Sequence, residues 1–114
     1  MHEFALMTHL LDAVESHARE LEATRVVTIN LAVGSRTGVV EDSFAFYFDM
    51  LTPGTVAEGA ELNMHHTSMR FHCPACHQDY TPVQADFDCP GCHAVGQLTD
   101  DGSQLLIESL EIET

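Results

Sequence analysis

The sequence predicts an α+β fold in which two helices cover a three-stranded mixed sheet and a small zinc-ribbon-like lobe is inserted between two strands. Three observations lead to this prediction. Two segments carry apolar residues at helical spacing, and three others have the composition of strands. A turn-rich stretch with two cysteine pairs separates the last two strands. We therefore divide the chain into a main α/β domain, residues 1–70 plus 97–114, and a metal-binding lobe, residues 71–96.

Both predicted helices are amphipathic. The first covers about residues 4–23, and its apolar residues recur every three or four positions: Phe4, Met7, Leu10, Leu11, Val14, Ala18 and Leu21. The second begins at Glu41, where two successive acidic residues favour a helix start, and ends before Thr52-Pro53-Gly54. Its apolar stripe consists of Phe44, Tyr47, Phe48 and Leu51.

The three predicted strands cover about residues 25–33, 60–71 and 103–112. The first is rich in β-branched residues, and strict alternation divides them between two faces. One face would carry Val27, Ile29, Leu31 and Val33, and the other Val26, Thr28, Asn30 and Ala32.

The composition narrows the classes of partner. The chain has 114 residues, with 18 Asp and Glu against four Arg and no Lys, so its formal charge is −14. Nucleic acids and anionic membrane surfaces attract clustered cations, and both are therefore disfavoured as partners. Metal ions and basic protein surfaces fit this charge. Neither a membrane-spanning apolar run nor a signal peptide is recognisable, so we expect a cytoplasmic protein whose cysteines stay reduced.

The four cysteines form two C-x-x-C pairs, Cys73-Pro74-Ala75-Cys76 and Cys89-Pro90-Gly91-Cys92, with twelve residues between them. Each pair makes a tight turn that directs two sulfurs to one point, and four thiolates complete the tetrahedron of a structural zinc site. A lobe this small cannot bury an adequate apolar core, so metal binding would supply its folding free energy. The pattern predicts Zn(II) held by Cys73, Cys76, Cys89 and Cys92.

Three other kinds of site use similar cysteine motifs. His77 and His93 follow the pairs, which gives the C-x-x-C-H pattern of haem attachment, but that reaction requires export from the cytoplasm. A thioredoxin-like redox site uses one pair at a helix start, whereas two pairs lie here in a turn-rich insert. An iron–sulfur cluster also takes four cysteines, so iron stays open beside zinc.

The N-terminus forms a second potential metal site. The Met1 amine, the deprotonated amide nitrogen of His2 and the His2 ring nitrogen close two adjacent chelate rings. Such a nitrogen set suits the square-planar preference of Ni(II) or Cu(II) better than the tetrahedron of zinc. Glu3, through its amide or carboxylate, or an acid from elsewhere such as Glu41 or Asp42, would complete the coordination.

These motifs together resemble the HypA/HybF family of nickel metallochaperones, and the resemblance runs essentially end to end. This chain departs from the family's pattern at two positions. Some family members have an acidic residue that assists nickel binding where this chain has Val40, and many members have Glu where this chain has Gln104. Besides the cysteine pairs, the matching segments are Met1-His2-Glu3-Phe4-Ala5-Leu6, Gly34-Ser35-Arg36-Thr37-Gly38-Val39, Phe46 and Phe48, Gly54-Thr55, Ala57-Glu58-Gly59-Ala60, Gly102-Ser103-Gln104-Leu105 and Ser109-Leu110-Glu111-Ile112-Glu113.

The resemblance implies a nickel chaperone that is not an enzyme. It implies Ni(II) as transient cargo at Met1, His2 and Glu3, and structural Zn(II) at the four cysteines. It also implies delivery of nickel to the large subunit of nickel–iron hydrogenase, with the GTPase HypB as a partner. The alternative is a zinc-ribbon protein-interaction module without a nickel role, and an iron–sulfur electron carrier is a third reading. As a separate hypothesis, His77 and His93 enter the zinc site when the pH falls towards 6.

Overall fold

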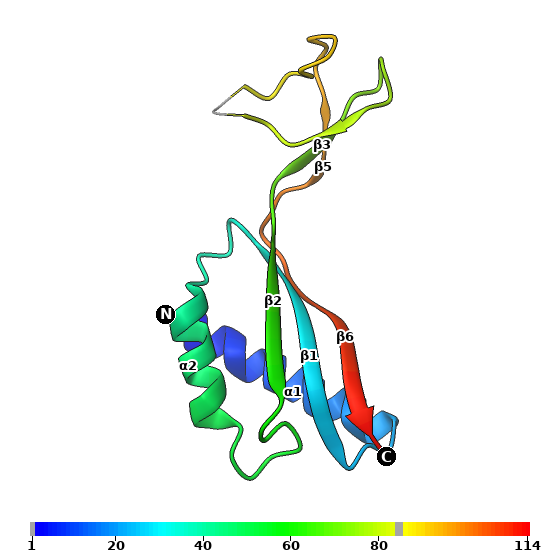
Figure 1. Cartoon of the computed structure of the whole chain (residues 1–114). Coiled ribbons are helices and arrows are strands. Elements are labelled where there is room, and N and C mark those ends of the chain that lie inside the picture. Colours follow the sequence, from blue (N-terminus) through cyan, green and yellow to red (C-terminus); the bar gives the residue numbers. More distant parts are fainter. Residues whose placement is uncertain (1, 84–85) are drawn as a thin grey trace.

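The computed structural model describes residues 2–83 and 86–114, and of His2 it describes the backbone only. The elements follow one another as α1 (His2–Glu20), β1 (Arg25–Gly34), α2 (Glu41–Leu51), β2 (Glu61–Thr67), β3 (Arg70–His72), β4 (Asp79–Tyr80), β5 (Gln97–Asp100) and β6 (Leu105–Glu113). They form two separate three-stranded sheets along a molecule of 53 × 29 × 17 Å (Figure 1).

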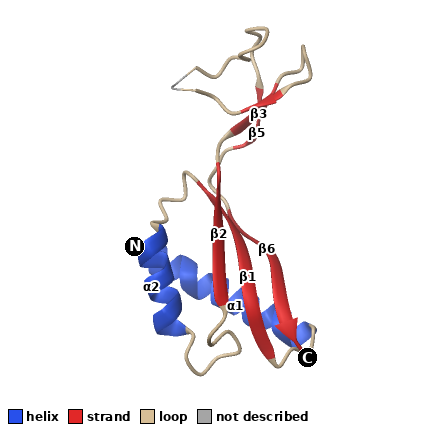
Figure 2. Ribbon diagram, viewed as in Figure 1, coloured by secondary structure: helices blue, strands red, loops and turns tan. Residues whose placement is uncertain are grey.

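The main sheet has the strand order β2-β1-β6. β1 pairs with β2 in parallel and with β6 antiparallel, so the sheet is mixed. The parallel pair requires a crossover connection, which α2 provides. Both helices lie on the same side of this sheet (Figure 2). The predicted α+β fold, with two helices on a three-stranded mixed sheet, is confirmed.

The core of the main domain lies between the helices and the sheet. Helix α1 contributes one side chain per turn, and α2 contributes two phenylalanines. The buried members of this core include Met7, Leu10, Val14 and Ala18 from α1, Val26, Ile29, Leu31 and Val33 from β1, and Phe44 and Phe48 from α2.

Helix α1 ends at Glu20, earlier than its apolar pattern predicts. Glu22 adopts the left-handed conformation with a φ of 55°. The N–H of Ala23 donates to the carbonyl of Ala18 at 2.9 Å, and the N–H of Glu22 donates to that of Arg19 at 3.1 Å. This hydrogen-bond pattern closes a helix with a Schellman motif, which stops α1 although apolar residues continue.

A bulge in β1 changes which valine is buried. The pairing with β6 passes from Val26–Ile112 directly to Thr28–Glu111, so Val27 is an extra residue in β1. Val26 is therefore fully buried in the core, where simple alternation predicts Val27. The predicted facing is wrong at this position and is confirmed at three core positions further along the strand: Ile29, Leu31 and Val33.

The second sheet belongs to the lobe and has the order β4-β3-β5. The segment predicted as one strand over residues 60–71 is divided between β2 and β3, and β5 was not predicted. The lobe sheet includes Arg70 and β5, which flank the predicted limits of 71–96. Those limits stay a prediction.

Gly34 lies where the chain segments that lead into the lobe converge. A Cβ at this position would be 2.1 Å from the carbonyl oxygen of Gly102, so no side chain fits. The N–H of Gly34 donates to Gln104 and that of Arg36 donates to Gly102, each at 2.8 Å. Glycine at position 34 thus allows the end of β1 to contact the segment between β5 and β6 directly.

Within the part of the chain that the structure describes, neither helix is long and apolar enough to cross a membrane.

Candidate metal centres

The four cysteine sulfurs of the lobe lie within 4.8 Å of one another. The Sγ atoms of Cys73 and Cys92 are 3.5 Å apart, and those of Cys76 and Cys89 are 3.6 Å apart. A tetrahedral zinc with Zn–S bonds of about 2.3 Å separates its sulfurs by about 3.8 Å. The donor set and its spacing therefore fit a zinc ion. The structure brings together all four cysteines that the sequence singles out.

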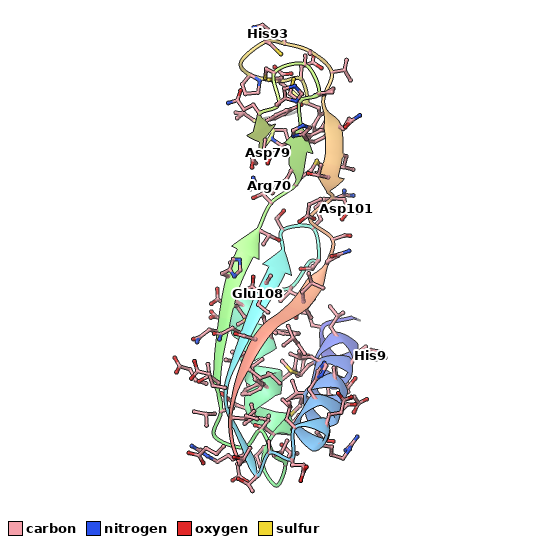
Figure 3. All side chains as sticks on the ribbon, turned by 90° about the vertical axis from the view of Figure 1, so that its right-hand side faces the viewer. His9, Arg70, Asp79, His93, Asp101 and Glu108 are labelled. Atoms are coloured by element: carbon pink, nitrogen blue, oxygen red, sulfur yellow. The ribbon has the colours of Figure 1, made fainter. Side chains whose placement is uncertain are left out.

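The two cysteine turns have the same backbone geometry. The N–H of His77 donates to the carbonyl of Cys73 at 2.8 Å, and the N–H of His93 donates to that of Cys89 at 2.8 Å. Both histidines adopt the left-handed backbone conformation, with φ values of 63° and 64°. Each histidine therefore closes its turn through the backbone, and His93 lies at the outer end of the lobe (Figure 3). The proposed entry of their rings at low pH stays a prediction.

The thiols influence one another strongly. The backbone N–H of Cys76 donates to the sulfur of Cys73 at 3.5 Å and lowers the pKa of Cys73 to about 6. A hydrogen bond from the Gln78 backbone lowers the pKa of Cys76, but contacts with the Cys73 and Cys89 sulfurs outweigh it and raise that pKa to about 12. One thiolate thus opposes ionisation of the next, and a divalent cation at the centre would offset two of the four negative charges and favour the deprotonated ligands.

Little apolar packing supports the lobe. Among the lobe residues that the structure describes, the buried ones are Cys73, Tyr80 and Cys89. The Tyr80 ring stacks on Phe71 with centroids 5.6 Å apart, and its hydroxyl donates to the carbonyl of Phe87 at 2.6 Å. Two of the three buried residues are metal-ligand types, so this small core agrees with a lobe whose folding depends on a bound ion.

Replacement of His93 tests its backbone role. We expect His93→Gly to retain zinc as well as the native chain, because glycine adopts a positive φ without strain. His93→Val should weaken zinc retention by about tenfold, because a β-branched residue is disfavoured there by roughly 1–2 kcal/mol. Competition with a chromophoric chelator at pH 7.5 measures both. Equal weakening in the two variants would instead assign the role to the imidazole ring.

The N-terminal candidate site is described only in part. Met1 and the His2 side chain lie outside the described residues, and helix α1 begins at His2. The first four N–H groups of a helix have no intrahelical acceptor, so the backbone nitrogens of this turn are not used within α1. The Glu3 carboxylate contacts the start of α2 by accepting hydrogen bonds from the Val40 N–H and, at 2.6 Å, from the Ser43 hydroxyl.

Of the two acids at the start of α2, Glu41 has a defined neighbour. Its carboxylate lies 3.4 Å from Nε2 of His66 on β2. His65, the preceding residue, lies on the opposite face of the strand, and its Nδ1 is 2.9 Å from the carboxylate of Glu108 on β6. Asp42 is exposed. The histidine pair therefore does not converge on one ion.

Ser43 is a residue that the sequence reasoning missed. Its hydroxyl joins the two helices through Glu3, and a signal for this contact exists in the sequence. The predicted second helix begins after Val40, which has no side-chain oxygen to cap a helix. A helix start without its own cap leaves N–H groups available to acceptors from another segment or from water.

Comparison with known proteins identifies the family. The profile described as "Hydrogenase/urease nickel incorporation, metallochaperone, hypA" matches residues 1–112. The chain is 36% identical over 114 residues to "Hydrogenase maturation factor HypA" of Caldanaerobacter subterraneus subsp. tengcongensis, covering 99% of this chain and 100% of the relative. It is equally 36% identical over 114 residues to the protein of the same name from Geobacter sp. (strain M21), with the same coverage.

A solved structure shares the fold. The solution structure of the Ni metallochaperone HypA from Helicobacter pylori has a TM-score of 0.71 and 23% identity, covering 99% of this chain and 98% of that chain. The resemblance seen in the sequence is thus confirmed along essentially the whole chain, and the chain belongs to the HypA family of nickel-incorporation metallochaperones.

Proposed function

We propose that this protein binds one Ni(II) at its N-terminus and delivers it to the large subunit of nickel–iron hydrogenase during maturation. The observation that supports this most strongly is the family match over residues 1–112, which includes the Met1-His2-Glu3 start. Nickel is the cargo, and the proposed donors are the Met1 amine, the amide and ring nitrogens of His2, and Glu3.

The chemistry of this donor set suits a chaperone for nickel. Two fused chelate rings around the amide of His2 impose a planar nitrogen environment, which Ni(II) accepts and zinc does not favour. Binding requires loss of the amide proton, so affinity falls when the pH is lowered and the cargo is released readily. The chain would act without catalysing a reaction of its own.

The zinc would have a structural role. The cysteine cluster lies in the small lobe, away from the start of α1 in the main domain (Figure 1). Zinc there would fold the lobe, while the nickel site stays separate. The formal charge of −14 favours partners with basic surfaces, among which we include the GTPase HypB and the hydrogenase large subunit. We place this activity in the cytoplasm, without a nucleic-acid or membrane partner.

A transfer experiment tests the proposal. The native chain is loaded with one equivalent of nickel, mixed with nickel-free hydrogenase large subunit and separated, and the nickel in each fraction is measured. We expect the nickel to appear in the large subunit, and His2→Ala to supply none because it does not load. If the native chain bound no nickel, the interaction-module alternative would replace this proposal. If it bound nickel without transferring it, the delivery role would be wrong.

A further inference from the structure

Helix α2 lacks a cap of its own. Val40 occupies the N-cap position, and its side chain makes no capping hydrogen bond. The residue three positions into the helix is Ser43, where Glu or Gln in a capping box would reach back to the N-cap N–H. The serine side chain is too short for that reach, so the Val40 N–H is left available to an acceptor outside the helix.

Glu3 of helix α1 supplies that acceptor. One carboxylate oxygen accepts from the Val40 N–H, and the other accepts from the Ser43 hydroxyl at 2.6 Å. Ser43 also lies 3.2 Å from the carbonyl oxygen of Val40. The negative charge stands at the N-terminal end of α2, where the helix dipole stabilises an anion. The capping box of α2 is therefore completed by a residue that is distant in sequence.

This contact fixes the first turn of α1. Glu3 directly follows His2, and both of its carboxylate oxygens are held by α2. An additional ring contact supports the same turn, because the Phe4 ring meets the edge of Tyr47 on α2 with centroids 5.5 Å apart. Chelation by backbone nitrogens needs the chain held in one conformation, and ordering a flexible terminus on binding would weaken affinity.

We propose that Ser43 and the Glu3 carboxylate are positioning residues for nickel, which hold the nitrogen donors of the first turn of α1 against α2. This inference rests on the proposed N-terminal nickel site. In this proposal Glu3 coordinates nickel through its backbone nitrogen. Its carboxylate keeps accepting hydrogen bonds from the Val40 N–H and the Ser43 hydroxyl. Ser43 takes part in nickel binding without contacting the metal.

The test measures nickel affinity by calorimetry in the native chain and in five zinc-loaded variants with the native terminus. Ser43→Ala removes one hydrogen bond to a charged group, and we expect nickel to bind about tenfold more weakly. Ser43→Thr keeps a hydroxyl and should bind within about twofold of the native chain. Ser16→Ala, on an exposed position of α1, is the matched control and should be unchanged. The double variant Glu3→Gln/Ser43→Ala should bind no more weakly than Glu3→Gln alone, because the two residues act as one unit.

The rival assignments give different results. If the Glu3 carboxylate were itself a nickel ligand, Ser43→Ala would release it and leave nickel affinity equal or higher, which would overturn the proposal. A purely structural role would lower the melting temperature of Ser43→Ala without changing nickel affinity at 20 °C, which would also overturn it. Additive losses in the double variant contradict it too. Absence of nickel binding by the native chain would overturn the proposed function itself, so the two failures are distinguishable.

Discussion

Addition of one glycine before Met1 is expected to abolish stoichiometric nickel binding, lowering affinity by at least about a hundredfold. The extension converts the primary amine of Met1 into an amide and so removes a strong nitrogen donor. His2→Ala should have an effect of the same size, because it removes the ring nitrogen and opens the second chelate ring. Glu3→Gln should have a smaller effect, since its backbone nitrogen remains. Calorimetric titration with Ni(II) at pH 7.5 measures all three.

Zinc content and the circular-dichroism spectrum serve as controls for this prediction. Both should stay as in the native chain, because the cysteine cluster and the core of the main domain lie elsewhere in the fold. A matched substitution is His9→Ala, which removes an imidazole from the exposed side of α1. It should bind nickel normally. If His9→Ala lost nickel while the extended chain kept it, surface histidines would form the site.

Loss of a single cysteine is expected to unfold the lobe while the main domain stays folded. Cys76→Ala or Cys89→Ala opens the tetrahedron and should weaken zinc binding by roughly 10²–10³-fold, about one quarter of the free energy of a four-ligand site. The lobe has only a small apolar core, whereas the main domain has its own. Amide resonances of the lobe should therefore collapse to unfolded positions, and those of the main domain should keep their dispersion.

The control for this prediction is His93→Gly, which changes the neighbour of Cys92 without removing a sulfur. This variant should keep one zinc per chain. Metal analysis after dialysis against a weak chelator gives the zinc content of each variant. One equivalent of zinc retained by both cysteine variants would refute the four-thiolate site.

Much of the fold follows from local patterns in the sequence. The helical spacing of apolar residues in α1 and α2 and the acidic start at Glu41 predict both helices, because these signals depend on near neighbours. The two cysteine pairs likewise predict the four-sulfur cluster. Each pair forms a tight turn from near neighbours in sequence, and a tetrahedral metal site requires the sulfurs of both pairs.

Other features depend on contacts that are distant in sequence. The extra residue Val27 is defined only by the pairing of β1 with β6, so alternation along one strand cannot reveal it. The end of α1 at Glu20 depends on a left-handed residue that is not glycine. The contact of Glu3 with Ser43 joins residues 40 positions apart. The only local sign of it is that Val40, at the N-cap of α2, has no side chain that can cap the helix.

X-ray absorption on the protein loaded with one nickel and one zinc tests the two-site account most directly. At the nickel edge, the account predicts a planar environment of nitrogen donors with a single imidazole and no sulfur. At the zinc edge of the same sample, it predicts four sulfurs at about 2.3 Å. Sulfur in the nickel shell would place nickel in the cysteine cluster, and several imidazoles would place it on surface histidines. Either result would contradict an N-terminal nickel site separate from a cysteine-bound zinc.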